Sequence, residues 1–235
     1  MKMRILAVSS ILFTGAVMAE TVVNFTPPAV IGNIVKPRKE DSSSAKEKLW
    51  KFNAAAPLFA GNIANGTKIF GGLQATGDNT DFMPVIGSTY GRIQLTAKAS
   101  GRATLKGVLL WDSKDFLKSG TYAFGPKSSI SANLFRNDGT VRWVIRNGDT
   151  YYISSISVRD AVPNAELKGS DKVQWAVWNP AADNGTGFLS VPADGFSAQT
   201  FNDVTAVGFA FDIVRGEQAR FMIENGGFTV NLDAK

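Results

Sequence analysis

Two residue types are missing from this chain of 235 residues: it has no cysteine and no histidine. Without cysteine there is no disulfide framework and no thiol nucleophile. Without histidine, every Ser-His-Asp or Cys-His catalytic arrangement is excluded. Zinc, copper and haem sites of the usual kinds are not expected either. Any chemistry would have to use carboxylate, Tyr, Lys or Arg side chains.

Long hydrophobic runs are also missing, apart from one at the N-terminus. There, Lys2 and Arg4 form a basic start, residues 5–17 are largely apolar, and a small-residue cleavage pattern ends at Ala19. These features predict a secretory signal peptide over residues 1–19. The apolar run is too short for a comfortable membrane span. We therefore expect an exported protein, secreted or periplasmic, with no membrane span.

The basic charge does not predict nucleic-acid binding. The formal charge is +5, and most basic residues are scattered. Their main cluster, residues 36–41, is mixed in sign and is followed by three serines, as is typical of a solvated loop. An exported domain without disulfides needs a large core, and 44% hydrophobic residues with 16 Phe can supply one. Export without cysteine favours a bacterial source.

Alternation of apolar and polar residues predicts many short strands and no long helix. Residues 20–235 are expected to form a single domain, an all-β, antiparallel, two-sheet jelly-roll β-sandwich. Pro and charged residues predict a long loop over residues 27–48, and one helical turn is expected at 46–52. Turns are expected at Gly71-Gly72 and at Gly226-Gly227. The expected strands are 21–25, 67–70, 91–99, 103–111, 129–135, 173–178, 204–214, 219–223 and 228–232, together with the hairpin described next.

The stretch RWVIRNGDTYYISS, residues 142–155, reads as a hairpin. Asn147-Gly148 is the strongest short signal for a two-residue turn of type I′, which requires φ > 0 at both positions. The expected cross-strand pairs are Arg146 with Asp149, Ile145 with Thr150, Val144 with Tyr151, Trp143 with Tyr152, and Arg142 with Ile153.

The two faces of this hairpin differ in character. One face, with Trp143 and Tyr152, is expected to be core. The other face mixes aliphatic residues with Arg142, Arg146, Asp149 and Tyr151. It has two interpretations: Arg146 and Asp149 pair beside the turn while Tyr151 covers the sheet edge, or the face is a polar-aromatic groove on a concave sheet. Such a groove suits sugars, whose C–H faces lie on aromatic rings and whose hydroxyls need fixed polar partners.

Two other places offer candidate residues. Trp175 and Trp178 should point to opposite faces of one strand, and Trp178, beside Asn179-Pro180, is the one expected to be exposed. Asp112 and Asp115 end an apolar strand and could either bind Ca²⁺ or cap a turn. The candidate ligand-binding residues are Arg142, Arg146, Asp149, Tyr151 and Trp178; catalytic residues are not expected, and the metal ligands are left unassigned.

Several segments together resemble exported bacterial jelly-roll domains, similar to galactose-binding-like and carbohydrate-binding modules. They are VVNF at 22–25, VLLW at 108–111, the hairpin above, WAVWNP at 175–180 and the closing strands from VGFAFDI onward. The resemblance covers most of residues 20–235. It implies a two-sheet sandwich, a last strand that pairs near the first, a non-catalytic glycan-binding role and often a structural Ca²⁺.

The sequence thus predicts a non-catalytic, extracellular polysaccharide-binding protein, with no cofactor except a possible structural Ca²⁺. A structural or adhesive surface protein is the first alternative. A polysaccharide lyase is the second, with Tyr151 as base and Arg142 neutralising a uronic carboxylate.

Overall fold

The computed structural model describes residues 19–21, 36–59, 68–86, 93–115, 120–134, 139–158, 165–182 and 189–235. These residues form strands and a 3-10 turn at Ser113–Asp115, with no α-helix among them. The strands are β1 (Ala19–Thr21), β2 (Ser42–Ser43), β3 (Glu47–Asn53), β4 (Ile69–Thr76), β5 (Asp81–Ile86), β6 (Ile93–Lys98), β7 (Ala103–Asp112), β8 (Tyr122–Ala123), β9 (Ser129–Leu134), β10 (Gly139–Asn147), β11 (Thr150–Ser157), β12 (Ala165–Lys168), β13 (Trp175–Trp178), β14 (Val204–Arg215) and β15 (Gln218–Ala234).

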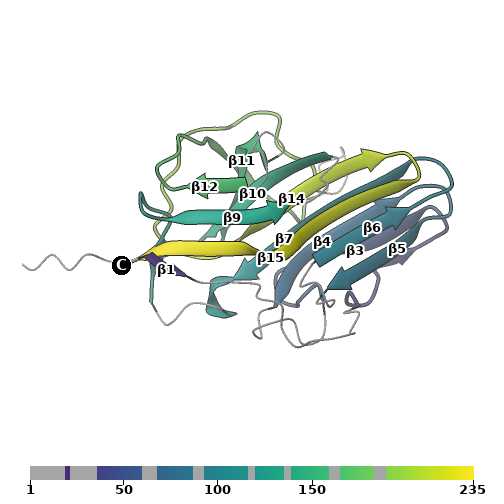
Figure 1. Ribbon diagram of the computed structural model, residues 1–235, viewed down its shortest axis with the longest axis horizontal. Coiled ribbons are helices and arrows are strands. Elements are labelled where there is room, and N and C mark those ends of the chain that lie inside the picture. The colour runs from purple at the N-terminus through teal and green to yellow at the C-terminus, as the bar shows by residue number, and fades with distance from the viewer. Residues whose placement is uncertain are drawn as a thin grey trace, which may run out of the picture.

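The strands build two antiparallel sheets (Figure 1). The smaller sheet has the order β12-β9-β15-β6-β5, and β1 and β8 also pair with β15. The larger sheet has the order β13-β11-β10-β14-β7-β4-β3-β2. The chain crosses repeatedly from one sheet to the other, as a jelly roll requires. The predicted antiparallel two-sheet β-sandwich is confirmed, and so is the pairing of the first strand with the last.

The inner core lies between the two sheets and is rich in aromatic rings. Phe211 of β14 stacks on Phe221 of β15 at 4.2 Å between ring centroids. Trp111 of β7 contacts Phe228 of β15 at 4.5 Å. These contacts join the central strands of one sheet to the longest strand of the other. Each fully buried ring contributes roughly 2 kcal/mol by leaving water, so the inner core accounts for the cohesion of a chain without disulfides.

A second apolar group, which we call the outer cluster, lies on the other face of the larger sheet. Its buried members are Val108, Leu110, Val144, Ile153, Ala176, Trp178, Leu189 and Ala210, with Phe52, Phe70, Tyr151 and Phe196 packed against them. Successive residues of β7 and β10 therefore enter different clusters, because side chains alternate along a strand. The sequence analysis expected one core face for the hairpin that contains β10. The structure adds a second, since both faces of the central strands are covered.

The larger sheet is curled so that its outer face is concave. Five strand spacings separate β11 from β3, which is roughly 24 Å in a flat sheet at about 4.8 Å each. Nevertheless the rings of Tyr151 and Phe52 touch edge to face, with centroids 5.5 Å apart. The register of β3 shifts between Trp50 and Asn53, and a bulge of this kind bends a strand. The two sides of the sheet thus meet over its middle.

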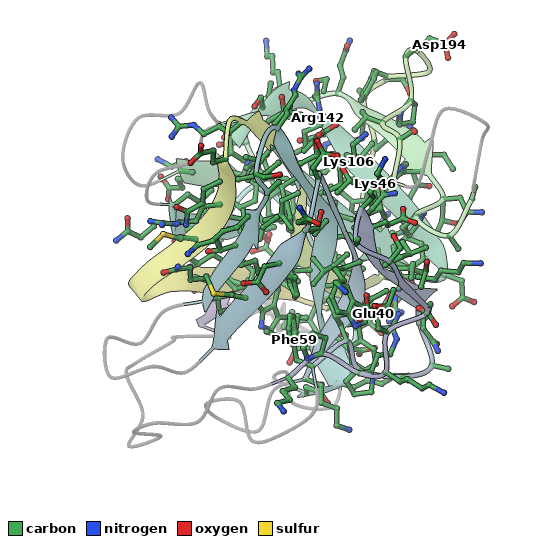
Figure 2. The ribbon with its side chains drawn as sticks, turned by 90° about the vertical axis from the view of Figure 1, so that its right-hand side faces the viewer. Glu40, Lys46, Phe59, Lys106, Arg142 and Asp194 are labelled. Atoms are coloured by element: carbon green, nitrogen blue, oxygen red, sulfur yellow. The ribbon has the colours of Figure 1, made fainter. Side chains whose placement is uncertain are left out.

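The segment 189–203 covers part of the concave face of the larger sheet. Leu189 is buried in the outer cluster and Phe196 packs against it. Ser197 bridges to Trp175 of β13, which ties the segment to the edge of the larger sheet. Asp194 points outward from its tip (Figure 2). The segment therefore seals the β11–β13 side of the concave face.

Several local predictions were wrong. The helical turn expected at 46–52 is absent, since the strand β3 occupies residues 47–53, and β2 and the start of β3 lie within the predicted loop 27–48. Gly71 and Gly72 lie inside β4, and Gly226 and Gly227 lie inside β15, so neither pair is a turn. The predicted strand 21–25 is not among these errors: Thr21 lies in β1, and residues 22–35, which include the rest of that strand, lie outside the described residues.

The predicted hairpin forms, but its loop is Gly148-Asp149 rather than Asn147-Gly148. Asn147 pairs with Thr150 across the loop. Gly148 has φ +56° and is the only residue of the loop with a positive φ, as at the first central position of a type II′ turn. A type I′ turn would need a second positive φ, which neither Asn147 nor Asp149 adopts.

The different loop displaces the cross-strand partners of residues 144–146 by two positions, and a further irregularity before Val144 displaces the partner of Arg142 by four, to Ser157. Tyr152 therefore pairs with Ile145 and not with Trp143, and Arg146 pairs with Tyr151 and not with Asp149. A shift of two keeps every side chain on its own face, because the period of a strand is two. The predicted division into a core face and a mixed face is consequently confirmed, although the predicted pairs are wrong.

Candidate functional site

One transverse row of the larger sheet brings aromatic and charged side chains together. Tyr151 of β11 lies opposite Arg146 of β10, Arg146 opposite Ala206 of β14, and Ala206 opposite Asp112 of β7. All four lie on the concave outer face and line one shallow hollow. Four strands, two of them remote from the hairpin in sequence, therefore contribute to one site.

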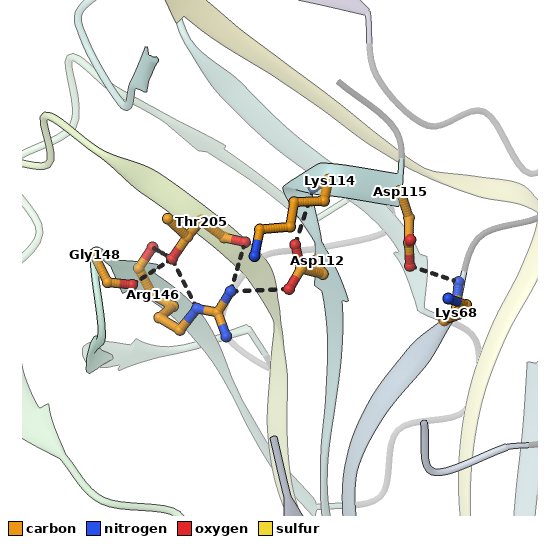
Figure 3. Close-up of polar contacts among 7 residues, drawn as sticks. All are labelled: Lys68, Asp112, Lys114, Asp115, Arg146, Gly148 and Thr205. Atoms are coloured by element: carbon orange, nitrogen blue, oxygen red, sulfur yellow. Dashed lines mark hydrogen bonds and ion pairs between the residues drawn. The ribbon is translucent and has the colours of Figure 1, made fainter. Parts of the chain in front are cut away.

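Arg146 is the most heavily bonded residue of this row (Figure 3). Its Nη2 lies 3.0 Å from Oδ2 of Asp112 and also donates to the backbone oxygen of Thr205 at 3.1 Å. Its Nε donates to the Thr205 hydroxyl at 2.7 Å. The two charged side chains are only 15% and 18% exposed, so water screens their attraction weakly.

The pKa of Arg146 reflects this setting. Burial alone lowers the pKa, but the side chains of Tyr151 and Asp112 outweigh that effect, and the pKa is raised above its ordinary value. The guanidinium group therefore stays charged throughout the range in which the protein folds. The site keeps a fixed cation beside a carboxylate.

A bulge in β14 places Thr205 beside Arg146. Arg146 pairs with Ala206 whereas Asn147 pairs with Val204, so Thr205 is the extra residue. Its hydroxyl donates to the carbonyl of Gly148 at 2.5 Å while it accepts from Arg146. The tip of the hairpin is thereby fastened to the start of β14, and the guanidinium plane is fixed.

The two aspartates after β7 cap backbone groups. Oδ1 of Asp112 accepts a hydrogen bond from the backbone N–H of Lys114 at 3.0 Å, and Oδ2 of Asp115 accepts from the N–H of Lys68 at 3.1 Å (Figure 3). Asp112 thus caps the turn that follows it, whereas Asp115 ties this turn to the start of β4. Among the described residues no group of three or more acidic side chains could hold a metal ion.

The rest of the hollow is apolar. Tyr151 has its ring 5.8 Å from Cζ of Arg146, within the range of a cation–π contact. Phe70 of β4, Leu110 of β7 and Ala54, just after β3, complete the lining. Tyr151 and Phe70 are both partly exposed, whereas Leu110 is 2% exposed. Two aromatic rings therefore stand at the rim, with Leu110 as the floor.

Two of the other residues predicted for the site lie elsewhere, whereas Trp178 of β13 lies opposite Tyr151 of β11. Arg142 donates from Nη1 to the carbonyl oxygens of Ser154 and Ser155, and four residues of β10, or about 13 Å, separate it from Arg146. Asp149 is exposed at the hairpin tip. The structure thus unites Arg146 and Tyr151 but brings neither Arg142 nor Asp149 to them.

Trp178 is buried, contrary to the prediction that it is exposed. It is 4% exposed, within the outer cluster, and its Nε1 donates to the carbonyl of Ser190 at 2.9 Å. Trp175 enters the inner core instead. The two rings do point to opposite faces, as expected, but a sheet with two covered faces buries both. The prediction failed because it assumed a single core.

Sequence reasoning missed three contributors: Thr205, Phe70 and Phe52. The partners of Arg146 are strands apart in the chain, so no local spacing reveals them. A usable signal did exist for the face as a whole, because the runs GVLLW and VGFAF are apolar at consecutive positions. Such runs are typical of strands buried on both faces.

The chain matches no protein-family model, no curated protein and no solved structure. In the part of the chain that the structure describes, no helix has the length and apolar character needed to cross a membrane. Function has to be inferred from the geometry of the hollow.

Proposed function

We propose that this protein binds carbohydrate, without catalysis, at the hollow lined by Tyr151, Arg146, Asp112 and Phe70. One observation supports the proposal above all others. Two partly exposed aromatic rings stand beside a fixed, weakly screened arginine–aspartate pair on the concave face of one sheet. Sugars combine flat C–H faces, which pack on aromatic rings, with hydroxyls that need oriented polar partners.

The polar groups of the hollow have capacity left for a ligand. A guanidinium group has five N–H donors. In Arg146, Nε and Nη2 donate three hydrogen bonds to Asp112 and Thr205, and the Tyr151 side chain is a fourth partner, which leaves one N–H for a ligand. Each carboxylate oxygen of Asp112 accepts one bond, while an ionised carboxylate has about four acceptor positions. Adjacent hydroxyls of one sugar could therefore accept from Arg146 and donate to Asp112.

The setting of this activity is proposed from the sequence. A signal peptide over residues 1–19 would export the protein, to the periplasm or beyond, where polysaccharides are the abundant polymer. The proposed partner is a polysaccharide or other glycan. A structural Ca²⁺ belongs to the same proposal and is tested with it.

The two alternatives receive less support from the geometry. A lyase with Tyr151 as base and Arg142 beside it would need these residues in one site, and the structure holds Arg142 on other partners. An adhesive role needs an exposed strand edge that can pair with a partner. The edge strand β13 is bridged by Ser197, and the edge strand β5 contains a proline at position 84, which blunts pairing. The other two edge strands, β2 and β12, have only 2 and 4 residues.

Affinity electrophoresis of residues 20–235 tests the proposal. The protein is run through native gels that contain starch, galactomannan, xylan or pectin, each with and without Ca²⁺. We expect retardation in one of these gels. The variant Tyr151→Leu, which keeps apolar volume but removes the ring, should lose it, and Tyr151→Phe should keep most of it.

The matched control is Lys106→Ala. Lys106 and Asp212 form an ion pair at 3.3 Å between the same two strands, β7 and β14, that bear Asp112 and Ala206. This pair lies at the other end of the ladder, so its loss should leave retardation unchanged. Equal retardation of the wild type and Tyr151→Leu would mean that the binding site lies outside the hollow. If none of the gels retards the folded protein, the proposal is wrong.

A further inference from the structure

The outer face of the smaller sheet carries a row of three residues from three adjacent strands. Arg220 of β15 lies opposite Thr96 of β6, and Thr96 lies opposite Met83 of β5. These strands lie side by side (Figure 1). Leu95 and Phe221, the chain neighbours of Thr96 and Arg220, belong to the inner core. The row therefore points away from the core, because side chains alternate along a strand.

Among the described residues, Arg220 differs from the other partly buried arginines because its charge has no partner. Arg38, Arg142 and Arg146 each donate to an oxygen of the protein. Arg220 forms no ion pair or hydrogen bond with any described residue, and its Nε is shielded from solvent. Buried polar groups are hydrogen-bonded as a rule, and a half-buried charge without a counter-charge is unfavourable. The arrangement therefore calls for an acceptor that is not part of the protein.

The charges around Arg220 favour an anion. On the same face, Lys98 of β6 lies diagonally from Arg220, at about 7–8 Å, because Lys98 pairs with Gln218. Asp81 of β5 is opposite Lys98 and is two strands away from Arg220, or roughly 10 Å. The carboxylate of Asp81 thus lies beside Lys98 and leaves the charge of Arg220 uncompensated.

The shape of the guanidinium and its neighbours indicate the class of ligand. A guanidinium presents its N–H donors in a planar fork, which matches the two oxygens of a carboxylate. Met83 is 36% exposed, so solvent reaches this face from the side of the edge strand β5, and its apolar side chain can contact the C–H groups of a sugar. With a formal charge of +5, the chain as a whole also attracts acidic polymers.

We propose that Arg220 binds the carboxylate of a uronic acid unit in an acidic polysaccharide, at a site distinct from the hollow. This inference rests on the proposed function, from which it takes the class of polymer, and it specifies that the polymer is acidic. It also accounts for the unpaired guanidinium, because the ligand supplies the counter-charge that the fold leaves out.

Native gels that contain polygalacturonate test the inference, with methyl-esterified polygalacturonate as the neutral counterpart. We expect the acid form to retard residues 20–235 and the ester to retard them far less. In Arg220→Gln, which keeps a long polar side chain but loses the charge, the dissociation constant from retardation should rise about tenfold, as expected for one charge-assisted contact. The matched control is Arg102→Gln, which removes the same charge from an exposed position and should bind like the wild type.

Thermal unfolding without polymer provides a second readout. Arg220→Gln should melt at the wild-type temperature or above it, because it removes a half-buried charge that has no partner among the described residues. A lower melting temperature would mean that the protein itself supplies a partner, and would overturn the inference.

The remaining outcomes separate the two proposals. No retardation by polygalacturonate, or an equal loss in Arg220→Gln and Arg102→Gln, would overturn the Arg220 site. Retardation by another polymer that Tyr151→Leu abolishes would still support the hollow. If Arg220→Gln loses binding to polygalacturonate while Tyr151→Leu keeps binding to every polymer, the Arg220 site stands and the hollow is refuted.

Discussion

Arg146 stabilises the junction of three strands. It joins the hairpin of β10 and β11 to β14 through Thr205 and to β7 through Asp112. Hydrogen bonds to charged groups contribute about 1.5–3 kcal/mol each. A half-buried partner left without its counter-charge loses that contribution and remains poorly solvated. The pair therefore supports both the shape of the hollow and the stability of the protein.

Replacing Asp112 tests this at the residue scale. We expect Asp112→Asn to lower the free energy of unfolding by about 2 kcal/mol, because Arg146 keeps its charge and loses its partner. The control is Asp212→Asn, since the Asp212 side chain is 45% exposed and exposed pairs contribute about 0–1 kcal/mol. Urea unfolding measures both. Equal effects of the two variants would contradict the role given to the Arg146 pair.

The pH dependence of stability should be flat near neutrality. The chain has no His and no Cys, so it lacks the side chains that ordinarily titrate there. The raised pKa of Arg146 gives stability that is fully present below its ordinary pKa and is lost only in strong alkali. We expect the urea midpoint to be constant between about pH 6 and about pH 8. A clear slope of the urea midpoint against pH in this range would contradict the prediction.

At the scale of the elements, the close packing of β4 against β7 requires a glycine at position 71. Gly71 has φ +148°, and a Cβ on it would lie 1.9 Å from the carbonyl oxygen of Val108 on β7. The two backbones approach this closely beside Asn53, where β3 leaves its regular register. The sequence analysis took Gly71 for a turn residue, but it permits a close strand contact that helps to curl the sheet.

The variant Gly71→Ala should therefore be strongly destabilised. We expect a loss of more than about 2 kcal/mol in the free energy of unfolding, because the methyl group forces β4 and β7 apart. Gly216→Ala serves as the control, since a Cβ there meets nothing within 4 Å, and its effect should stay within about 0.5 kcal/mol. Thermal unfolding of the two variants provides the comparison, and similar melting temperatures would refute the close-approach argument.

The bulge in β3 also bends the strand, so that Phe52 lies across the concave face and contacts Tyr151. Removing this ring in Phe52→Ala should cost about 2 kcal/mol, from lost burial and the lost edge-to-face contact. Amide hydrogen exchange should accelerate at Leu110 and Val144, which the ring helps to cover. Val177→Ala, at a side chain 63% exposed, should change neither quantity. Unchanged exchange in Phe52→Ala would mean that the sheet is not closed by this contact.

Element prediction succeeded where alternation was enough. Ile93, Leu95 and Ala97, at alternate positions of β6, are buried, as alternation along the expected strand 91–99 predicts, and the two faces of the hairpin also agree. Element prediction failed at the hairpin turn, where the backbone conformation of a single residue decides the turn type. Asn147-Gly148 reads as a type I′ turn, yet only Gly148 takes a positive φ, and the register follows the turn that forms.

At the scale of the molecule, the all-β sandwich could be predicted because many short alternating strands have few other ways to bury one face. The curl of the larger sheet could not, since it depends on bulges and on a contact between β3 and β11 that are about a hundred residues apart. The candidate site, too, could be predicted from the sequence only in part. Arg146 and Tyr151 are neighbours across a hairpin and were predicted, whereas Asp112, Phe70 and Thr205 join them only through the strand order.

The most direct test is an amide NMR titration of the protein, residues 20–235, with short oligosaccharides of the polysaccharide that retards it in the gels. We predict that chemical-shift changes concentrate on the lining of the hollow, at Arg146, Tyr151, Asp112, Ala206 and Phe70, and that the signals of Lys106 and Asp212, further along the same two strands, do not change. Changes centred on another surface, with the lining of the hollow unaffected, would contradict the proposed binding site.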